Sequence, residues 1–280
     1  MNSFNINRFC KTFRWFFCMN LRSLLMWTGG FTVAIFLTGM MIFFFNPNNP
    51  HAALNIIAQF DAIFILIGLL ASTCTFLSDF NKKPKREAFL MLPGSNLEKF
   101  LSAVIYVVIV FAFALLLSVV LGDTLRMVFR SLAYGDEWMS AIPKVAKGVI
   151  PNIMLNDGSH VYSLSYKVMN LFVGYSFILW IHSLYTLGGT LLRKYAFVIT
   201  SVAMIFFMMV LSWVLNHIDA SMFTSQWDGN AYVGEEVGVM AYVFAIMLPL
   251  LSIFNYWASF HIFKGYQLIT NKWTNYDFLK

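Results

Sequence analysis

The chain has 280 residues, of which 59% are apolar and only 11% are charged. A soluble domain usually carries about 25% charged residues, so most of this protein's surface must face something other than water. The net charge of +6 does not indicate a nucleic-acid partner, because the basic residues lie beside long apolar runs, as expected for flanks that face lipid headgroups.

Residues 1–22 have the pattern of an amphipathic helix. Aromatic and aliphatic side chains fall on one helical face, and basic side chains fall largely elsewhere. Such a helix lies in the headgroup plane with its apolar face toward the acyl chains. We expect a cytoplasmic interfacial helix here; the alternative is a simple basic flank of the first membrane span.

Six apolar runs follow, each long enough to cross a bilayer core of about 30 Å as a helix. They cover residues 24–45, 56–77, 101–121, 168–192, 195–215 and 237–263. The sequence therefore predicts an all-α integral membrane protein with six transmembrane helices, forming a single membrane domain over residues 1–280.

The distribution of Lys and Arg predicts the orientation of these spans, since basic residues concentrate in cytoplasmic segments. Of the 19 basic residues, fourteen lie in the two ends and in the second and fourth loops. The other five lie between residues 126 and 167. Both termini are thus expected in the cytoplasm, with residues 122–167 and 216–236 as outer segments. A short amphipathic helix around residues 125–132 is expected in the first of these.

The cytoplasmic loop of residues 78–100 carries the clearest local signals. Ser95 followed by Glu98 predicts a capping box, so the third span should begin near Asn96. Ahead of it, residues 87–92 form a short apolar piece flanked by charge. This piece could dock into a groove of a cytoplasmic partner, or it could be a solvated loop whose apolar side chains dip into the headgroups.

Two ionisable side chains lie within the spans. Asp61 is costly in a membrane unless paired or wetted, which makes it a candidate intramembrane polar site. His182 is the second candidate, although a neutral histidine hydrogen-bonded to a neighbouring helix is the simpler interpretation.

No catalytic or metal-binding pattern occurs. The sequence contains no GxxxxGK[ST] phosphate loop, no HExxH and no GxSxG, which argues against ATP hydrolysis or hydrolase chemistry by these motifs. Glu235-Glu236 resembles part of an intramembrane protease motif, but Met240 stands where that motif requires Arg. We therefore expect no enzyme activity and no bound cofactor.

The stretch REAFLMLPGSNLEKFL at residues 86–101 resembles a signature of bacterial ABC-2-type transporter permeases, and the six-span layout is also similar to that family. The resemblance implies a dimeric permease, pairing with itself or another permease chain in the bacterial cytoplasmic membrane. A separate ABC subunit would bind ATP and dock beneath it. The coupling residues implied are Lys85, Arg86, Glu87, Phe89, Leu90 and Leu92.

Two other classes stay open. One is a non-transporting membrane scaffold or immunity protein that keeps a permease-like fold and only binds a partner. The other is an intramembrane enzyme, which would require Asp61, His182 and Glu235 to face one cavity.

Overall fold

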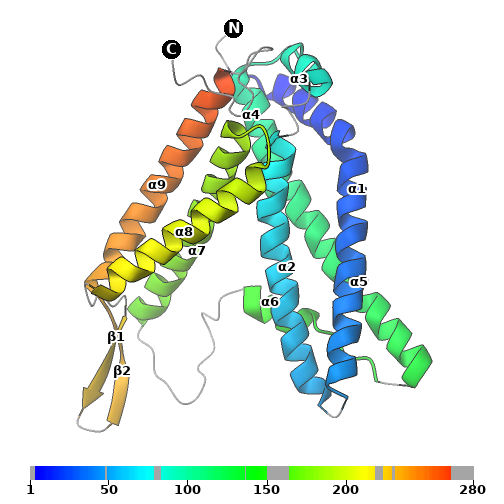
Figure 1. Ribbon diagram of the computed structural model, residues 1–280, viewed down its shortest axis with the longest axis vertical. Coiled ribbons are helices and arrows are strands. Elements are labelled where there is room, and N and C mark those ends of the chain that lie inside the picture. Colours follow the sequence, from blue (N-terminus) through cyan, green and yellow to red (C-terminus); the bar gives the residue numbers. More distant parts are fainter. Residues whose placement is uncertain are drawn as a thin grey trace. The chain divides into compact units, whose positions relative to one another are not determined.

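Long helices form nearly all of the computed structural model, which describes residues 4–47, 49–78, 83–135, 137–149, 164–217, 223–228 and 231–265. Figure 1 shows the elements in chain order. They are α1 (Ile6–Phe45), α2 (Pro50–Ser78), α3 (Lys83–Leu90), α4 (Asn96–Ile105), the π-helical segment η2 (Tyr106–Phe111), α5 (Ala112–Tyr134), α6 (Ile142–Val149), α7 (Leu164–Leu191), α8 (Ala196–His217), β1 (Phe223–Asp228), β2 (Ala231–Val237) and α9 (Val239–Lys264).

Six helices in the described part of the chain are long and apolar enough to span a membrane. They are α1, α2, the continuous helix Asn96–Tyr134, and the α7, α8 and α9 helices. Each of the six runs identified in the sequence coincides with one of them, although three runs extend one or two residues past a helix end. Their exposed positions carry large apolar side chains such as Leu37, Phe113 and Phe206, as expected for helices surrounded by hydrocarbon. A helix suits this surrounding because its backbone N–H and C=O groups bond to one another within the helix.

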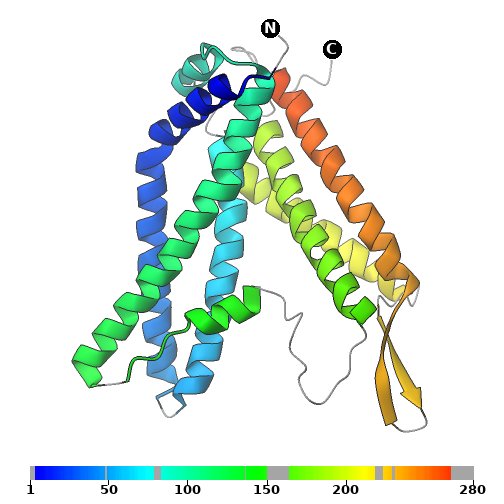
Figure 2. The same ribbon diagram turned by 180° about the vertical axis from the view of Figure 1, so that it is seen from behind.

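The first helix differs from the sequence-based expectation of two separate elements. Residues 6–45 form one uninterrupted α-helix, capped at its start by the Asn5 side chain, which accepts from the backbone N–H groups of Asn7 and Arg8. Figure 2 shows that the dark blue beginning of α1 runs at an angle to the rest of the helix. The expected amphipathic segment is therefore the first part of the first membrane-length helix.

The third membrane-length helix extends beyond its expected end. The residues predicted to form a separate amphipathic helix around 125–132 continue α5 to Tyr134, where Gly135 ends the helix in a left-handed conformation with φ 68°. Figure 2 shows α4, η2 and α5 as one rod. Residues 125–132 are helical, as expected, but they belong to the same helix as the third span and do not form a separate element.

The chain divides into two units. The first, called unit 1, comprises residues 1–76 and 88–151; unit 2 comprises residues 77–87 and 152–280. In unit 1, α1 packs along α5. A Cβ atom at Gly122 would lie 2.7 Å from Ile35 Cγ2, so the close approach of these helices depends on a glycine, as is common between membrane helices. Ser118 Oγ donates to the Thr28 carbonyl across the same contact at 3.1 Å.

The interior of unit 1 around η2 is aromatic. Tyr106 is fully buried, and its ring lies 5.0 Å from that of Phe16 and 5.3 Å from that of Phe76, both edge-on. The hydroxyl of Tyr106 is buried without a hydrogen-bond partner. A π-helical turn at this position widens the helix locally, and such turns frequently mark functional sites.

Unit 2 contains α7, α8 and α9, with α7 packed along α9. Asn255 Nδ2 donates to Ser183 Oγ at 3.0 Å and so joins the two helices. Gly188 on α7 admits Thr200 of α8, because a Cβ atom at this glycine would collide with the Thr200 side chain. Pro249 lies inside α9 without ending it.

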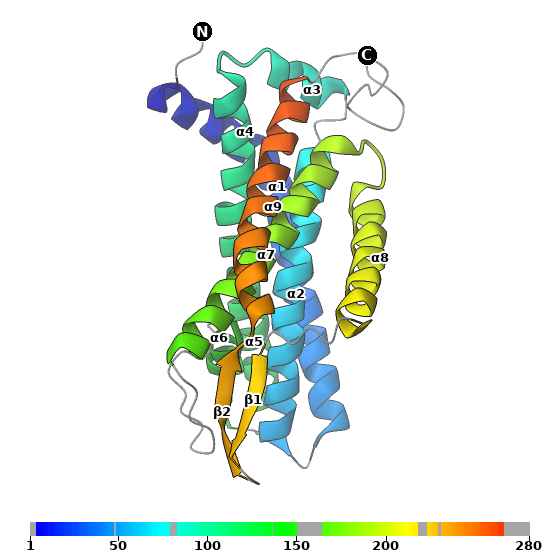
Figure 3. The same ribbon diagram turned by 90° about the vertical axis from the view of Figure 1, so that its left-hand side faces the viewer.

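An antiparallel hairpin is the departure from the all-α expectation within the described residues. The β1 and β2 strands pair from Phe223↔Val237 to Asp228↔Ala231, with a register shift between Gln226 and Trp227. Except for Val237, they lie in the segment 216–236 that was expected as an outer segment. Figure 3 shows β2 leading directly into the start of α9.

Candidate functional site

A buried carboxylate joins the starts of α1 and α4 in unit 1. Glu98 is fully buried. Its Oε2 accepts from the Ser95 backbone N–H at 2.9 Å while Ser95 Oγ accepts from the Glu98 N–H at 3.3 Å, so the capping box expected from the sequence is present. Its Oε1 accepts from the Asn5 backbone N–H at 2.8 Å and pairs with Arg8 at 3.1 Å. We call Asn5, Arg8, Ser95 and Glu98 the Glu98 junction.

The α3 helix is also held to α1 by an aromatic contact. Phe89 on α3 is only 3% exposed; its ring lies 6.4 Å from that of Trp15, and the Lys99 ammonium lies 5.5 Å from its ring centre. This ring is therefore covered by its own chain, and the role of Phe89 in contacting a partner stays a prediction.

The other predicted coupling residues differ in accessibility. Arg86 is buried, whereas Lys85, Glu87 and Leu92 are partly exposed. The side chain of Leu90 lies outside the described structure. Met91, by contrast, is 84% exposed.

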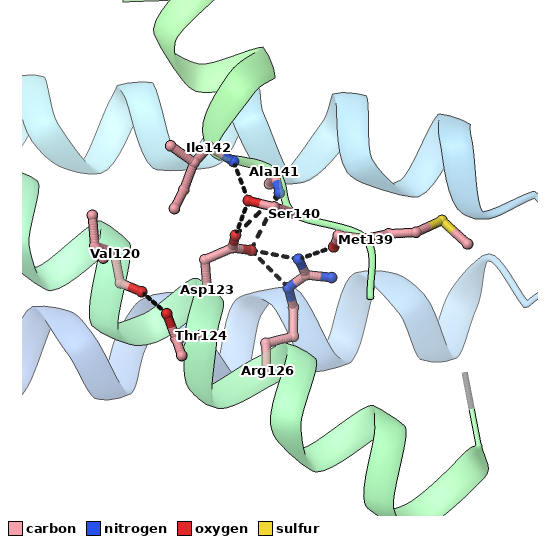
Figure 4. Close-up of polar contacts among 8 residues, drawn as sticks. All are labelled: Val120, Asp123, Thr124, Arg126, Met139, Ser140, Ala141 and Ile142. Carbon is pink, nitrogen blue, oxygen red and sulfur yellow. Dashed lines mark hydrogen bonds and ion pairs between the residues drawn. The ribbon is translucent and has the colours of Figure 1, made fainter. Parts of the chain in front are cut away.

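A second buried carboxylate, Asp123, lies on α5 of the same long helix, and Figure 4 shows its polar contacts. Asp123 is 1% exposed and forms an ion pair with Arg126, which is 2% exposed. Asp123 Oδ2 accepts from Ser140 Oγ at 2.7 Å and from the Ala141 backbone N–H at 3.1 Å. The Arg126 guanidinium also donates to the Met139 carbonyl at 2.8 Å. We call these five residues the Asp123 clip.

The Asp123 clip fastens the segment before α6 onto the long helices. Ala141 belongs to a small apolar cluster with Phe43 of α1 and with Ala53, Leu54 and Ile57 of α2. Lys144 Nζ on α6 adds a hydrogen bond to the His51 carbonyl at 2.9 Å. The ion pair on α5 is thus satisfied by further hydrogen bonds from the loop, which is the condition under which a buried pair is tolerated. The apolar cluster and Lys144 attach the same segment to α1 and α2.

Asp61, the first intramembrane candidate, belongs to this end of unit 1. Its side chain is 1% exposed, and its Oδ2 has no hydrogen-bond partner. It lies within electrostatic range of both Asp123 and Arg126. A buried carboxylate oxygen left without a partner is uncommon and merits a functional explanation.

His182, the second candidate, lies in unit 2. Its Nδ1 is 2.7 Å from the Tyr256 hydroxyl, which joins α7 to α9. The simpler interpretation of His182, a hydrogen bond to a neighbouring helix, agrees with this contact. The structure does not bring Asp61 and His182 into one unit, and the side chain of Glu235 lies outside the described structure.

In the described part of the chain, six membrane-length helices with exposed apolar side chains indicate a multi-pass helical membrane protein. Comparison of the chain with models of protein families, with curated proteins and with solved structures finds no match.

Proposed function

We propose that this protein is the membrane-spanning subunit of an ABC-2-type transporter, powered by ATP hydrolysis on a separate subunit. It works in the bacterial cytoplasmic membrane with both termini in the cytoplasm, as a dimer with itself or with a second permease chain. The beginning of α1 lies in the cytoplasmic headgroup region. The absence of a phosphate loop from the sequence fits a division of labour in which this chain supplies the pathway.

The Glu98 junction is the observation that supports this proposal most strongly. A transporter of this kind requires a part that receives movement from an ATPase and passes it to several membrane helices. Glu98 bonds the start of α1 through Asn5 and Arg8, and it caps α4 through Ser95. Because these contacts are buried and charge-assisted, they are strong, and displacement of the loop moves both helices together.

The exposed apolar side chains of the loop between α2 and α4 and of the first turn of α4 form the surface on which the ATPase docks. Met91 is 84% exposed and Leu97 is 46% exposed, so these two apolar side chains are available for a partner where Phe89 is not. Apolar anchors buried at the centre of an interface contribute most of its binding free energy. The Phe89 side chain instead packs against Trp15 and so holds the loop against α1.

Pull-down from native membranes tests this proposal. The chain should recover an ATP-binding subunit, and the double variant Met91→Ala, Leu97→Ala should recover at least about tenfold less, since 1.4 kcal/mol corresponds to a tenfold change in affinity. A matched control is Phe44→Ala, Leu132→Ala, which removes two apolar side chains that are 79% and 84% exposed near the other end of unit 1.

The outcomes separate the competing classes. Loss of the ATPase in the first variant and its retention in the control support the transporter. Recovery of a partner that binds no ATP would favour the scaffold or immunity protein. Unchanged recovery in both variants would show that the loop is not the docking surface.

A further inference from the structure

Asp61 lies on the face of α2 that packs into unit 1. Ile57, one turn earlier, is 2% exposed and belongs to the apolar cluster that contains Ala141 of the Asp123 clip. Gly68, two turns later, lies against α5, since an added Cβ atom would be 2.9 Å from Leu115 Cδ2. Residues four and seven positions apart share one face of a helix. The Asp61 carboxyl, on a side chain that is 1% exposed, is therefore held among the interior contacts of α2.

The Asp61 carboxyl lacks the kind of partners that Glu98 and Asp123 have. Those two carboxylates each pair with an arginine and accept from backbone N–H groups. Asp61 Oδ2 is buried and has no hydrogen-bond partner. An ionised carboxylate without a counter-ion or donors has a large desolvation cost in apolar surroundings, and such a group neutralises instead. This environment favours the protonated carboxyl, which needs no counter-ion.

The charges near Asp61 add to this preference. Among the charged groups of the described residues, the two that act electrostatically on Asp61 are Asp123 and Arg126, both on α5. Arg126 already uses its Nε and Nη2 atoms for Asp123 and for the Met139 carbonyl. One guanidinium balances one carboxylate, so an ionised Asp61 would add a buried negative charge with no cation of its own. Like charges that share a site disfavour ionisation of one of them.

The other ionisable groups near α2 lie farther along the helix. Residues 23–45 of α1 contain none. On α2 itself, the other ionisable side chains are those of His51 and Cys74, about 15 and 20 Å from Asp61 along the helix axis at 1.5 Å per residue. Lys144 of α6 bonds to the carbonyl of His51 and so belongs to that distant turn. The charge state of Asp61 is therefore decided by its burial and by the Asp123–Arg126 pair.

We propose that Asp61 is a proton-binding site that is linked to the Asp123 clip. The carboxyl holds a proton in the structure described here, which accounts for its lack of a counter-ion. When the proton leaves, the Asp61 carboxylate competes with Asp123 for Arg126 and weakens the bonds that hold residues 139–141. Because linkage is reciprocal, opening of the clip also favours release of the proton. This inference concerns unit 1 and does not depend on the proposed transport function.

Infrared difference spectroscopy of the full chain in lipid bilayers tests the proton site. The difference between wild type and Asp61→Asn should show the carbonyl band of an un-ionised carboxyl at about pH 6, where an ordinary aspartate is ionised. Carboxylate bands should replace it as the pH is raised. Aspartate labelled with ¹³C at its carboxyl group identifies the band in the wild-type chain, so the assignment does not require the variant to fold.

Three results would overturn the proton site. Carboxylate bands at about pH 6 would show that Asp61 is ionised like an ordinary aspartate. A carbonyl band that persists up to the pH at which the protein unfolds would show a neutral group that never releases its proton. A band that changes when choline replaces Na⁺ at constant pH would show that the carboxyl holds a metal cation instead.

Hydrogen exchange of the peptide 137–142 tests the link to the clip. After correction for the intrinsic effect of pH, exchange in the wild type should become at least about tenfold faster as the carbonyl band is lost, because amides exchange through local opening. Asp61→Asn, which is neutral and similar in shape, should keep exchange slow throughout. Glu137→Gln is the matched control: it removes an exposed carboxyl that lines a pocket with Arg126 and Arg130, and it should keep the wild-type dependence on pH.

The exchange data can contradict the link in three ways. Unchanged wild-type exchange during loss of the band would separate the proton from the clip. The wild-type dependence on pH in Asp61→Asn would show that another group controls the segment. Loss of that dependence in Glu137→Gln would assign the effect to the exposed carboxyl.

Discussion

At the residue scale, Glu98 and Asp123 organise unit 1 by the same physical means. Each is a fully buried carboxylate on the helix Asn96–Tyr134, paired with an arginine and bonded to backbone N–H groups. A buried charge of this kind is stable only when its partners are all in place. Removing either carboxylate should therefore affect elements that are distant in sequence.

The Asp123 clip gives the first prediction. Asp123→Ala leaves Arg126 buried without its counter-ion and releases the N–H of Ala141, so unfolding should become easier by about 3–5 kcal/mol. Limited proteolysis should cut the segment 137–142 much faster than in the wild-type chain. Thr124→Ala is the control, since Thr124 is exposed and bonds only to the carbonyl of Val120 one turn earlier. Equal protection in both variants would show that the clip does not hold this segment.

The Glu98 junction gives a prediction that compares two substitutions. Ser95→Ala removes one cap and should cost about 1 kcal/mol, with faster hydrogen exchange confined to the first turn of α4. Glu98→Ala removes the acceptor for Ser95, Asn5 and Arg8, and each bond to a charged group contributes about 1.5–3 kcal/mol. Exchange should then rise at the start of α1 as well. If only α4 responds to Glu98→Ala, the two helix starts are not coupled.

At the scale of elements, the contact between α1 and α5 depends on where glycine is placed. Gly122 has Ile35 Cγ2 at 2.7 Å and the Thr32 carbonyl oxygen at 3.1 Å from the position of an added Cβ atom, whereas Gly29 has nothing within 4 Å. Both glycines lie inside helices. The same substitution should therefore have opposite effects at the two positions.

We expect Gly122→Ala to destabilise the protein by about 1–3 kcal/mol, the usual result of overfilling a packed contact. Gly29→Ala should stabilise it by about 0.5–1 kcal/mol, because alanine loses less backbone entropy in a helix. Thermal unfolding in detergent would measure both. Destabilisation of similar size at Gly29 would mean that helix flexibility, not the approach of α1 to α5, controls the result.

At the scale of the whole molecule, the unequal distribution of basic residues leads to a prediction of topology. In a chain whose Cys10, Cys18 and Cys74 are replaced by serine, Glu137→Cys should react with an impermeant thiol reagent added to intact cells. Met91→Cys and Tyr195→Cys should react only after the membrane is opened; all three positions are exposed. Reaction of Met91→Cys in intact cells would reverse the proposed orientation.

Local patterns were sufficient to predict the six membrane-length helices and the capping box at Ser95 and Glu98. Both depend on properties that neighbouring residues carry with them: the length of an apolar run and the spacing of two side chains in one helical turn. The hairpin also has a local signal, since Gly229-Asn230 separates two runs rich in aromatic and β-branched residues, although the pattern of charge and hydropathy predicts only an outer segment there.

Tertiary structure alone decided the rest. Asp123 and Arg126 lie three positions apart in the segment 122–167 expected outside the membrane. Their partners are the backbone of Met139 and Ala141 and the hydroxyl of Ser140. Backbone groups have no sequence signature, so no pattern indicates which loop meets a buried charge. Phe89 is an apolar residue in a short loop flanked by charge, which suggests an exposed docking residue, yet its ring packs against Trp15 of α1. Contacts between segments distant in the chain determine whether an apolar side chain remains accessible.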